Sequence, residues 1–412
     1  MAGGADLDEL AALYRDLHAH PELAFAEHRT AGIVAERLAG LGYQVITGVG
    51  GTGVVGVLAN GTGPVVLLRA DMDGLPVLEQ TGLPYASTRR AKDSDGADVP
   101  VMHACGHDMH VTCLLGAAAE LAAARAAWRG TLLLVFQPAE EAGKGARAMV
   151  DDGLYERVPV PDIVLGQHVM PLPAGVLSVH GGPAMAAVDA LRVVLYGQGG
   201  HGSRPETTVD PILMAAAAVL RLQGVVSREL AASETTVLTV GALRAGTAPN
   251  IIPDQAELLL SLRTFNDKVH AKAREAIDRI IRAEAAASGA LKEPEITTTV
   301  SFPVLVNDPA ACARLTDRFS AGVGLTLDTG PVTGSEDVGL LATAVGAPCA
   351  YWFIGGSDPA LFEGIMTVEE AREIVDGLPS NHSPLFAPVI DPTIRTGVAA
   401  LTAAASDWLS AS

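Results

Sequence analysis

The sequence carries at residues 102–110 the stretch Met102-His103-Ala104-Cys105-Gly106-His107-Asp108-Met109-His110, in which four side chains can bind a transition metal. Cys105 and His107 are separated by one residue, and successive side chains on a regular helix point about 100° apart. A thiolate and an imidazole at this spacing reach one cation from a turn. The stretch therefore predicts that Cys105 and His107 lie at a loop-to-helix corner.

The segments around this corner alternate between short strands and helices. Strands are expected at residues 43–46, 54–58, 65–68, 131–136 and 163–166, and an Ala/Leu-rich helix at about 108–127. Three of these strands lead into Asp73, into Glu140 and Glu141, and into His168. Because open α/β sheets present reactive groups at the carboxyl ends of their strands, we predict that these side chains meet at one edge of a mostly parallel sheet.

A glycine-rich segment, Gly48-Val49-Gly50-Gly51-Thr52-Gly53, satisfies the spacing of a dinucleotide-binding fingerprint. The segment is followed by an expected strand and another glycine turn rather than by a helix. Without a helix N-terminus there is no dipole to receive a pyrophosphate, so we interpret the segment as a β-turn.

The pattern changes after Gly181-Gly182-Pro183. Strands are expected at 189–198, 235–243, 255–264 and 295–302, and helices at 209–227 and 269–287. This β-α-β-β-α-β order is typical of a four-stranded antiparallel sheet with two helices on one face. We predict an α/β catalytic domain, with a mostly parallel sheet flanked by helices, formed by 1–186 and 302–412. An α+β domain, 187–301, is inserted between these two parts.

The composition excludes several classes of protein. The chain has 412 residues, of which 49% are hydrophobic, so two folded domains are expected and disorder is not. A formal net charge of −19 argues against nucleic-acid and anionic-membrane partners. The first thirty residues are too polar for a secretory signal, and we expect a cytoplasmic protein. Four scattered cysteines form no disulfide framework, so a reducing compartment leaves Cys105 available as a ligand.

The candidate metal-binding side chains outnumber the ligands of one zinc ion. Five come from four separate segments: Cys105, His107, Glu141, His168 and His382. Two cations about 3.5–4 Å apart that share a water would use all five. Glu140 and Glu141 are neighbours whose side chains point apart, so Glu141 can bind metal while Glu140 acts as the general base. Asp73 is placed to orient a ligand histidine.

Several motifs carry a resemblance to a known family. They are Leu68-Arg69-Ala70-Asp71-Met72-Asp73-Gly74-Leu75-Pro76, His103-Ala104-Cys105-Gly106-His107-Asp108, Gln137-Pro138-Ala139-Glu140-Glu141 and Asn381-His382-Ser383-Pro384. In this order they resemble the amidohydrolases that include hippurate hydrolase and the indole-acetyl-amino-acid hydrolases. The chain is similar, more distantly, to carboxypeptidase G and succinyl-diaminopimelate desuccinylase.

The resemblance implies a usually dimeric enzyme that hydrolyses the amide of an N-acyl amino acid at a centre of two divalent metal ions. Zinc, manganese, nickel and cobalt all suit the mixed ligand set. By analogy the ligands are the five residues named above, Glu140 is the base and Asp73 its supporting acid. A homodimer is expected through the inserted domain.

The resemblance extends into the inserted domain. His201 matches a family histidine that reaches the partner's scissile carbonyl, Asn250 a residue that meets substrate, and Arg263 a carboxylate-binding arginine. The sequence departs from the common family pattern at two places. Residues 88–100 lengthen the segment that leads to the metal loop, residues 102–107, and Gly202-Ser203-Arg204 follow His201 in place of the more usual small residues. These departures leave the acyl group and the amino acid of the substrate open.

Most of these residues also have an ordinary structural interpretation. Cys105 suits a buried core position, His168 and His382 ordinary polar positions, and Glu140 and Glu141 a solvated helix start. His201 suits a glycine-rich turn and Arg263 a strand surface. For His103 and His110 we favour hydrogen bonds to the backbone. Glu336 and Asp337 suit either a helix cap or support of the site.

Two alternative functions remain beside the amidohydrolase. One is a dipeptidase or carboxypeptidase that uses the same dinuclear centre. The other is a non-catalytic metal-binding or ligand-binding protein that retains the fold. Replacement of Glu140 by Gln discriminates between a catalyst and a binding protein.

Overall fold

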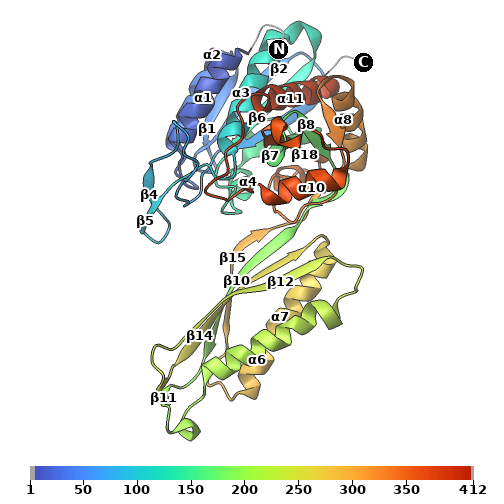
Figure 1. Cartoon of the computed structure of the whole chain (residues 1–412). Coiled ribbons are helices and arrows are strands. Elements are labelled where there is room, and N and C mark those ends of the chain that lie inside the picture. Colours follow the sequence, from blue (N-terminus) through green and yellow to red (C-terminus); the bar gives the residue numbers. More distant parts are fainter. Residues whose placement is uncertain (1–4, 410–412) are drawn as a thin grey trace. The chain divides into compact units, whose positions relative to one another are not determined.

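The computed structural model describes residues 5–409 and divides into two compact units. Unit 1 consists of Met1–Gly182, Val306–Gly330 and Asp337–Ser412. Unit 2 consists of Pro183–Leu305 together with the short segment Pro331–Glu336. The two units are described separately below (Figure 1).

Unit 1 is built on a mixed sheet of eight strands. In spatial order they are β1 (Gln44–Val49), β2 (Gly53–Asn60), β6 (Gly130–Gln137), β3 (Val65–Asp71), β7 (Ile163–Pro173), β18 (Cys349–Ser357), β8 (Val176–Val179) and β17 (Leu325–Leu327). The central strands β6, β3, β7 and β18 run parallel, whereas β1, β2 and β6 pair antiparallel and β8 is antiparallel to β18. The predicted α/β class is confirmed, with a parallel centre and antiparallel additions.

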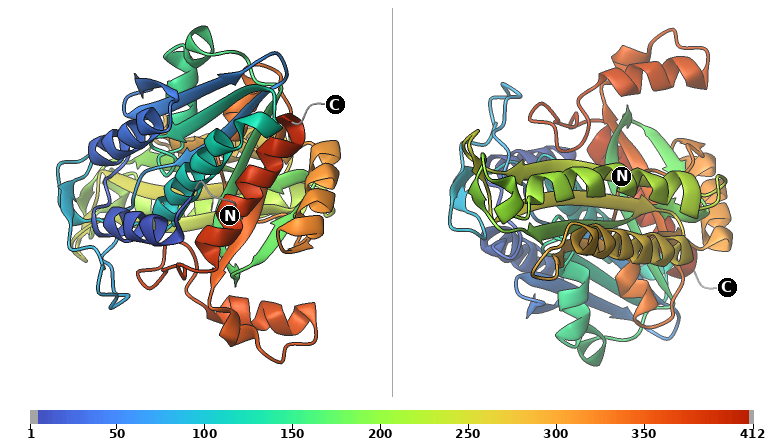
Figure 2. Two further views of the ribbon diagram at one scale, coloured as in Figure 1. Left: turned by 90° about the horizontal axis from the view of Figure 1, so that it is seen from above. Right: turned by 90° about the horizontal axis from the view of Figure 1, so that it is seen from below.

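Nine helices of unit 1 lie within the described residues. They are α1 (Leu7–Ala19), α2 (His28–Gly40), α3 (His107–Ala123), α4 (Gly145–Asp151), α5 (Leu154–Arg157), α8 (Pro309–Gly322), α9 (Gly339–Thr343), α10 (Val368–Gly377) and α11 (Thr393–Leu409). Helices α1, α3 and α11 lie side by side over one face (Figure 2). A short hairpin of β4 (Arg90–Lys92) and β5 (Asp98–Pro100) forms from the 88–100 segment.

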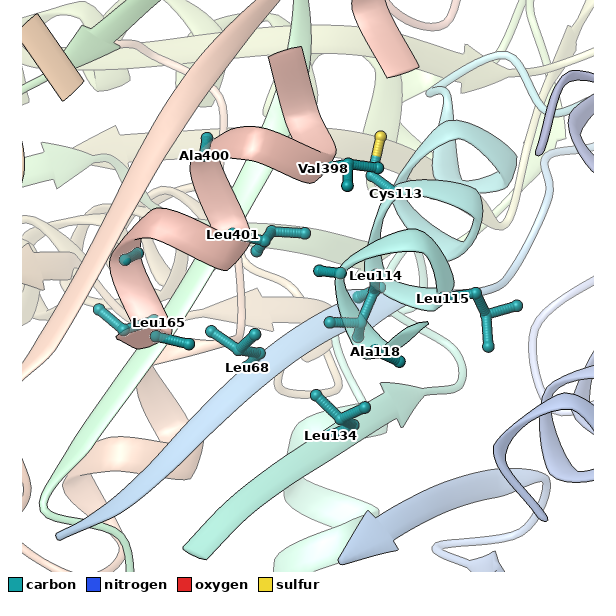
Figure 3. Packing of buried hydrophobic residues seen from close by; sticks show 14 of the residues in the cluster. Leu68, Cys113, Leu114, Leu115, Ala118, Leu134, Leu165, Val398, Ala400 and Leu401 are labelled. Carbon is teal, nitrogen blue, oxygen red and sulfur yellow. The ribbon is translucent and has the colours of Figure 1, made fainter. Parts of the chain in front are cut away.

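Helix α3 lies at the centre of this layer, and most of its residues are buried. Leu114 of α3 and Leu401 of α11 pack above Leu68 and Leu134 of the sheet (Figure 3). Burial of each such side chain stabilises the fold by about 1.5–3 kcal/mol. A Cβ at Gly116 would lie 2.5 Å from Cγ2 of Val398, so this glycine allows the close approach of α11. The packing fixes the N-terminus of α3 at the carboxyl ends of the parallel strands.

Unit 2 has the predicted β-α-β-β-α-β order. The elements are β10 (Ala187–Tyr196), α6 (Pro211–Gly224), β12 (Thr236–Ala245), β14 (Gln255–Thr264), α7 (Asp267–Ala287) and β15 (Glu295–Phe302), with β11 (Gly200–His201) and β13 (Ile251–Ile252) as a short added pair. The antiparallel sheet has the order β12-β14-β10-β15. Alternate residues such as Leu191, Val193, Leu258 and Leu260 are buried under α6 and α7, which lie side by side (Figure 2).

One helical segment, Pro211–Glu229, is long and apolar enough to cross a membrane by length and composition alone. Its face toward the sheet of unit 2 buries Met214 and Ala218, while Leu213 and Leu220 are 69% and 76% exposed. The segment therefore packs as one side of a folded unit and leaves an apolar outer side.

The predicted end of one strand is wrong. We expected β7 to cover 163–166, with His168 just beyond its end, but β7 continues to Pro173. After its last pairing with β3 at Gly166, β7 keeps its ladder with β18, where Phe353 lies opposite His168. His168 therefore extends from the middle of a strand.

The glycine segment is a turn, as predicted. β1 ends at Val49 and pairs antiparallel with β2, which begins at Gly53, so no helix follows. Gly50 has φ +65°, and a Cβ there would lie 2.5 Å from the Met149 nitrogen of α4. The turn thus requires glycine for both its conformation and its packing.

A buried histidine joins α1 to the first turn of α3. Nδ1 of His18 lies 2.7 Å from Oδ2 of Asp108, and Nε2 lies 3.0 Å from Oε1 of Glu79. All three side chains are buried. Burial lowers the pKa of His18, but the hydrogen bonds to the two carboxylates outweigh it and raise the pKa to about 10. His18 is therefore an imidazolium between two carboxylates at neutral pH.

Replacing His18 by Gln is expected to lower the free energy of unfolding by about 1.5–3 kcal/mol near pH 6, because a neutral amide leaves both carboxylates without a counter-charge. The pKa of His18 is about 10 in the folded protein and about 6.5 in the unfolded chain. Its stabilising contribution is therefore complete below pH 6.5 and is lost as the pH rises through about 10. Urea unfolding at a series of pH values should show the penalty shrinking over this window.

His20→Gln is the matched control, since His20 is half-exposed and lies 3.4 Å from Asp16. Its penalty should stay below about 1 kcal/mol. A His18→Gln penalty that is the same at pH 6 and pH 10 would contradict the assignment.

Candidate metal centre

The metal loop turns into α3 at Gly106, which has φ +83°. A Cβ there would lie 2.4 Å from Cγ1 of Val169, so glycine is required by conformation and by space. His107 is the first residue of α3 and Cys105 precedes the turn. The predicted loop-to-helix corner is confirmed.

All five predicted ligand side chains converge in unit 1. The Sγ of Cys105 lies 3.5 Å from Nε2 of His168. Oε1 of Glu141 lies 3.2 Å from Nε2 of His382 and 3.8 Å from Nε2 of His107. Donors on one tetrahedral cation lie about 3.3–3.8 Å apart when their bonds are about 2.0–2.3 Å long. The distances suit ligands gathered around cations.

The donor atoms form two groups of three that share Cys105. One group contains Cys105, His107 and His168, and the other contains Cys105, Glu141 and His382. In each group the donor atoms lie within 4.8 Å of one another. A third group contains His107, Glu140 and Glu141. Cys105 therefore belongs to both groups and would be within reach of a cation bound by either of them.

Two of the buried donor atoms lack a hydrogen bond of normal geometry, which supports the fit of a metal. Nε2 of His107 and Oε1 of Glu141 are buried and have no hydrogen bond of normal geometry. Burial, with the charges of Glu141 and Glu140, raises the pKa of the Cys105 thiol well above its usual value. A thiolate at this position therefore requires a cation beside it. The N, O and S donors are the set that zinc, manganese, nickel and cobalt accept.

The surrounding backbone orients the ligands. Nδ1 of His168 donates to the Val169 carbonyl at 2.8 Å, which leaves Nε2 as the donor toward a metal. The backbone nitrogen of His382 donates to the Ala104 carbonyl at 2.8 Å, and Nδ2 of Asn381 donates to the Cys105 carbonyl at 3.2 Å. The tail segment is thereby fixed against the metal loop.

Asp73 joins the histidine to both glutamates. Its Oδ1 lies 3.3 Å from Nδ1 of His107 and accepts from the Glu140 nitrogen at 3.1 Å, and its Oδ2 accepts from the Glu141 nitrogen at 3.0 Å. Asp73 is 1% exposed, and burial raises its pKa. Burial lowers the pKa of His107, but the charge of Asp71 and the hydrogen bond to Asp73 outweigh it and raise that pKa to about 10.

Comparison with known proteins assigns the family. Residues 67–376 match peptidase family M20/M25/M40. The chain belongs to this family. It is 38% identical to hippurate hydrolase of Campylobacter jejuni over 84% of this chain and 88% of that protein. It is 36% identical to thermostable carboxypeptidase 1 of Saccharolobus solfataricus over 84% of this chain and 86% of that protein.

A solved structure gives the same assignment. A dinuclear metal-binding peptidase of the M20 family from Bacillus subtilis aligns with a TM-score of 0.75 and 28% identity, covering 98% of both chains. The resemblance inferred from the motifs is confirmed. This M20 protein is a metal-dependent hydrolase that acts on amide bonds.

The M20 centre contains a buried polar network that sequence reasoning missed. Asp71 accepts from Nη1 of Arg69 at 2.7 Å, and its Oδ1 lies 2.5 Å from Nδ1 of His110. Nε2 of His110 accepts from the Val169 nitrogen at 2.9 Å, so Nδ1 carries the proton. Burial alone would raise the pKa of Asp71, but His107, His110 and Arg69 together hold it well below its usual range.

Asp337 completes this network. It accepts from Nη2 of Arg69 at 3.3 Å, from Nε2 of Gln137 at 2.6 Å and from the Ala146 nitrogen at 3.0 Å. Asp337 therefore contacts both the buried network and the first turn of α4, and its two predicted roles stay predictions. Strand alternation in β3 places Arg69 and Asp71 on one face, and this signal in the sequence would have identified Asp71.

Two histidines near the ligands were expected to contact the backbone. His110 does so through Val169, and it also contacts Asp71. Both ring nitrogens of His103 are buried without a hydrogen bond of normal geometry, although the backbone of Asp73 acts on the ring. Burial lowers the pKa of His103 to about 4, so its ring is neutral.

The remaining predicted residues belong to unit 2. His201 is exposed on β11, and its Nδ1 accepts from the Ser203 nitrogen at 3.1 Å. The carbonyl of Asn250 accepts from the Gly202 nitrogen at 2.8 Å. Nη1 of Arg263 donates to the Thr333 carbonyl at 2.6 Å. The substrate roles of His201, Asn250 and Arg263 stay predictions.

Proposed function

We propose that this protein hydrolyses N-acyl amino acids to a carboxylic acid and an amino acid. One observation carries the proposal: two groups of metal-binding donors share Cys105 beside the buried carboxylate of Glu140. The 38% identity to a hippurate hydrolase supports an N-acyl amino acid as substrate.

The proposed centre holds two divalent ions, zinc, manganese, nickel or cobalt. Cys105, His107, Glu141, His168 and His382 are the proposed ligands. Bound divalent ions would supply Lewis acidity toward a carbonyl and lower the pKa of a water. His107 and Glu141 are the best supported, because each offers a buried donor atom without a hydrogen bond.

Glu140 is the proposed general base. It takes the proton of the attacking water and then delivers that proton to the leaving amine nitrogen, which restores the carboxylate. Asp73 supports this role by fixing the backbone nitrogen of Glu140. Arg263 and Asn250 are proposed to hold the substrate carboxylate, since a guanidinium matches that anion.

We propose a homodimer through unit 2, in which the partner's His201 stabilises the oxyanion. The contact of Ser203 with Nδ1 supports this role because it fixes the tautomer and leaves Nε2 protonated. The exposed Leu213 and Leu220 of α6 support an interface on this unit. A cytoplasmic location is proposed as well, because the protein has four free cysteines.

A carboxypeptidase or dipeptidase is the second candidate function, favoured by the 36% identity to a thermostable carboxypeptidase. Purified protein should be assayed on benzoyl-glycine, Gly-Gly and benzoyl-glycinamide, with metal content measured in parallel. Benzoyl-glycine should be the best substrate. The amide, which lacks the carboxylate, should lose about 10²-fold or more in kcat/KM.

A chelator should abolish turnover, and one of the four divalent ions should restore it. Preference for Gly-Gly over benzoyl-glycine would favour the dipeptidase. Unchanged activity after the metal is removed would contradict the proposed centre.

A further inference from the structure

The residue before the two catalytic-site glutamates has an unusual backbone conformation. Ala139 has φ +50°, in the left-handed region that non-glycine residues rarely adopt. The side chain of Ala139 is fully buried. Because Glu140 follows directly, the conformation of Ala139 sets the direction in which the chain presents Glu140 and Glu141. Contacts elsewhere must hold this conformation.

The buried carboxylate of Glu27, in the N-terminal region, holds Ala139 in this conformation. Oε1 of Glu27 accepts from the Ala139 nitrogen at 2.8 Å and from the Phe25 nitrogen at 3.0 Å. Oε2 accepts from Oγ1 of Thr52 at 2.5 Å. Glu27 is 0% exposed, so a carboxylate has been buried where three donors satisfy it.

The local structure does not require this carboxylate. Glu27 occupies the N-cap position of α2, yet its side chain makes no cap hydrogen bond. Glu22 provides the cap instead, since its carboxylate accepts from the Arg29 nitrogen and the Thr30 nitrogen, both at 2.9 Å. The side chain of Glu27 therefore serves Ala139 and Thr52 rather than its own helix.

Thr52 gives the glycine turn a structural role. The turn between β1 and β2 places its hydroxyl against Glu27, and Gly50 allows the turn to approach α4 at Met149. On the other side, the Ala139 carbonyl accepts from the Gly145 nitrogen at 3.1 Å, at the start of α4. The peptide units of Ala139 are therefore fixed by Glu27 and by α4.

We propose that Glu27 is a positioning residue that sets the direction of Glu140 and Glu141 through the left-handed backbone of Ala139. The proposal rests on the function proposed for those two glutamates. A displacement of about 1 Å at a catalytic group costs about 10²-fold in rate. The role of Glu27 is therefore visible in kcat.

The test compares Glu27→Gln with Glu22→Gln in the full-length protein. The two carboxylates come from the same segment and accept the same kind of backbone hydrogen bond. Glu27→Gln should lower kcat by about 10–100-fold, with KM within about threefold, when it is assayed at the metal content of the wild type. Glu22→Gln should keep kcat within about threefold. Equal losses of kcat in both variants would overturn the proposal.

Two further variants test the mechanism. Ala139→Gly in the Glu27→Gln background should recover about threefold or more of kcat, since glycine adopts φ > 0 without strain. Thr52→Val keeps the carboxylate of Glu27 but removes one of its hydrogen-bond donors, and it should lower kcat by about 3–10-fold. This variant replaces Glu27→Gln in the test if Glu27→Gln is too unstable to purify. Wild-type kcat in Thr52→Val together with no recovery by glycine would overturn the proposal.

Amide hydrogen exchange separates this proposal from the proposed function. Exchange at Ala139 and Glu140 should accelerate at least about tenfold in Glu27→Gln and not in Glu22→Gln, whatever substrate the enzyme prefers. If wild type fails on every N-acyl amino acid, the proposed function fails while exchange still tests the role of Glu27. Unchanged exchange at these amides would overturn that role.

Discussion

Replacing Glu140 by Gln is expected to lower kcat on benzoyl-glycine by about 10²–10⁴-fold, the usual contribution of a general base. Gln has nearly the same shape but cannot take a proton from water. Glu140 is 5% exposed and its backbone is fixed by Asp73, so the amide should occupy the same place. Metal content and the unfolding midpoint should stay as in the wild type.

Glu141→Gln is the informative contrast, because the neighbouring residue is proposed to bind metal. This variant should lose metal, and added divalent ion should restore part of its activity. Glu36→Gln, an exposed position on α2, controls for the loss of one negative charge. Retained turnover in Glu140→Gln would remove the assignment of Glu140 as the general base.

The sequence was sufficient for the features that depend on local pattern. The spacing of apolar residues, with a period of two in strands and about 3.6 in helices, predicted the order of elements in unit 2. The single residue between Cys105 and His107 predicted the corner at Gly106. The five proposed ligands were predicted from metal-binding residue types that stand at a turn, at expected strand ends and in the family motifs, and the structure brings these side chains together.

Features that depend on contacts distant in the chain could not be predicted. β7 passes His168 without ending because β18, about 185 residues later, continues its ladder. The contact of Glu27 with Ala139 spans 112 positions, and nothing in the local sequence marks Ala139 as left-handed. Asp337 was ambiguous for the same reason, since its partner Arg69 lies 268 positions earlier.

The buried guanidinium of Arg69 is the counter-charge for the carboxylates behind the metal centre. Arg69 is 1% exposed and donates to Asp71 at 2.7 Å, to Gln137 at 2.9 Å and to Asp337 at 3.3 Å. Its planar fork satisfies separate acceptors at once, which an ammonium group on a flexible stem cannot do. Two buried carboxylates therefore depend on one residue.

Arg69→Met is expected to lower the free energy of unfolding by about 3–5 kcal/mol at pH 7, because Asp337 loses the guanidinium beside it and Asp71 keeps only the histidines His107 and His110 as counter-charges. Asp71 has a depressed pKa in the folded protein, so its contribution to stability is present above its unfolded value of about 3.9 and is lost as the pH falls below it. The difference in the free energy of unfolding between wild type and Arg69→Met, measured by urea unfolding, should therefore stay constant down to about pH 4 and narrow only below it.

Arg90→Met is the matched control. Arg90 also lies on a strand and bonds a carboxylate, with its Nε 2.6 Å from Oδ2 of Asp98, but the two side chains are 51% and 53% exposed. Water screens this pair, so its loss should cost less than about 1 kcal/mol. The double variant Arg69→Met with Asp337→Asn should recover part of the stability, since one unpaired charge is removed. Equal penalties for Arg69→Met and Arg90→Met would mean that the buried carboxylates are compensated without Arg69.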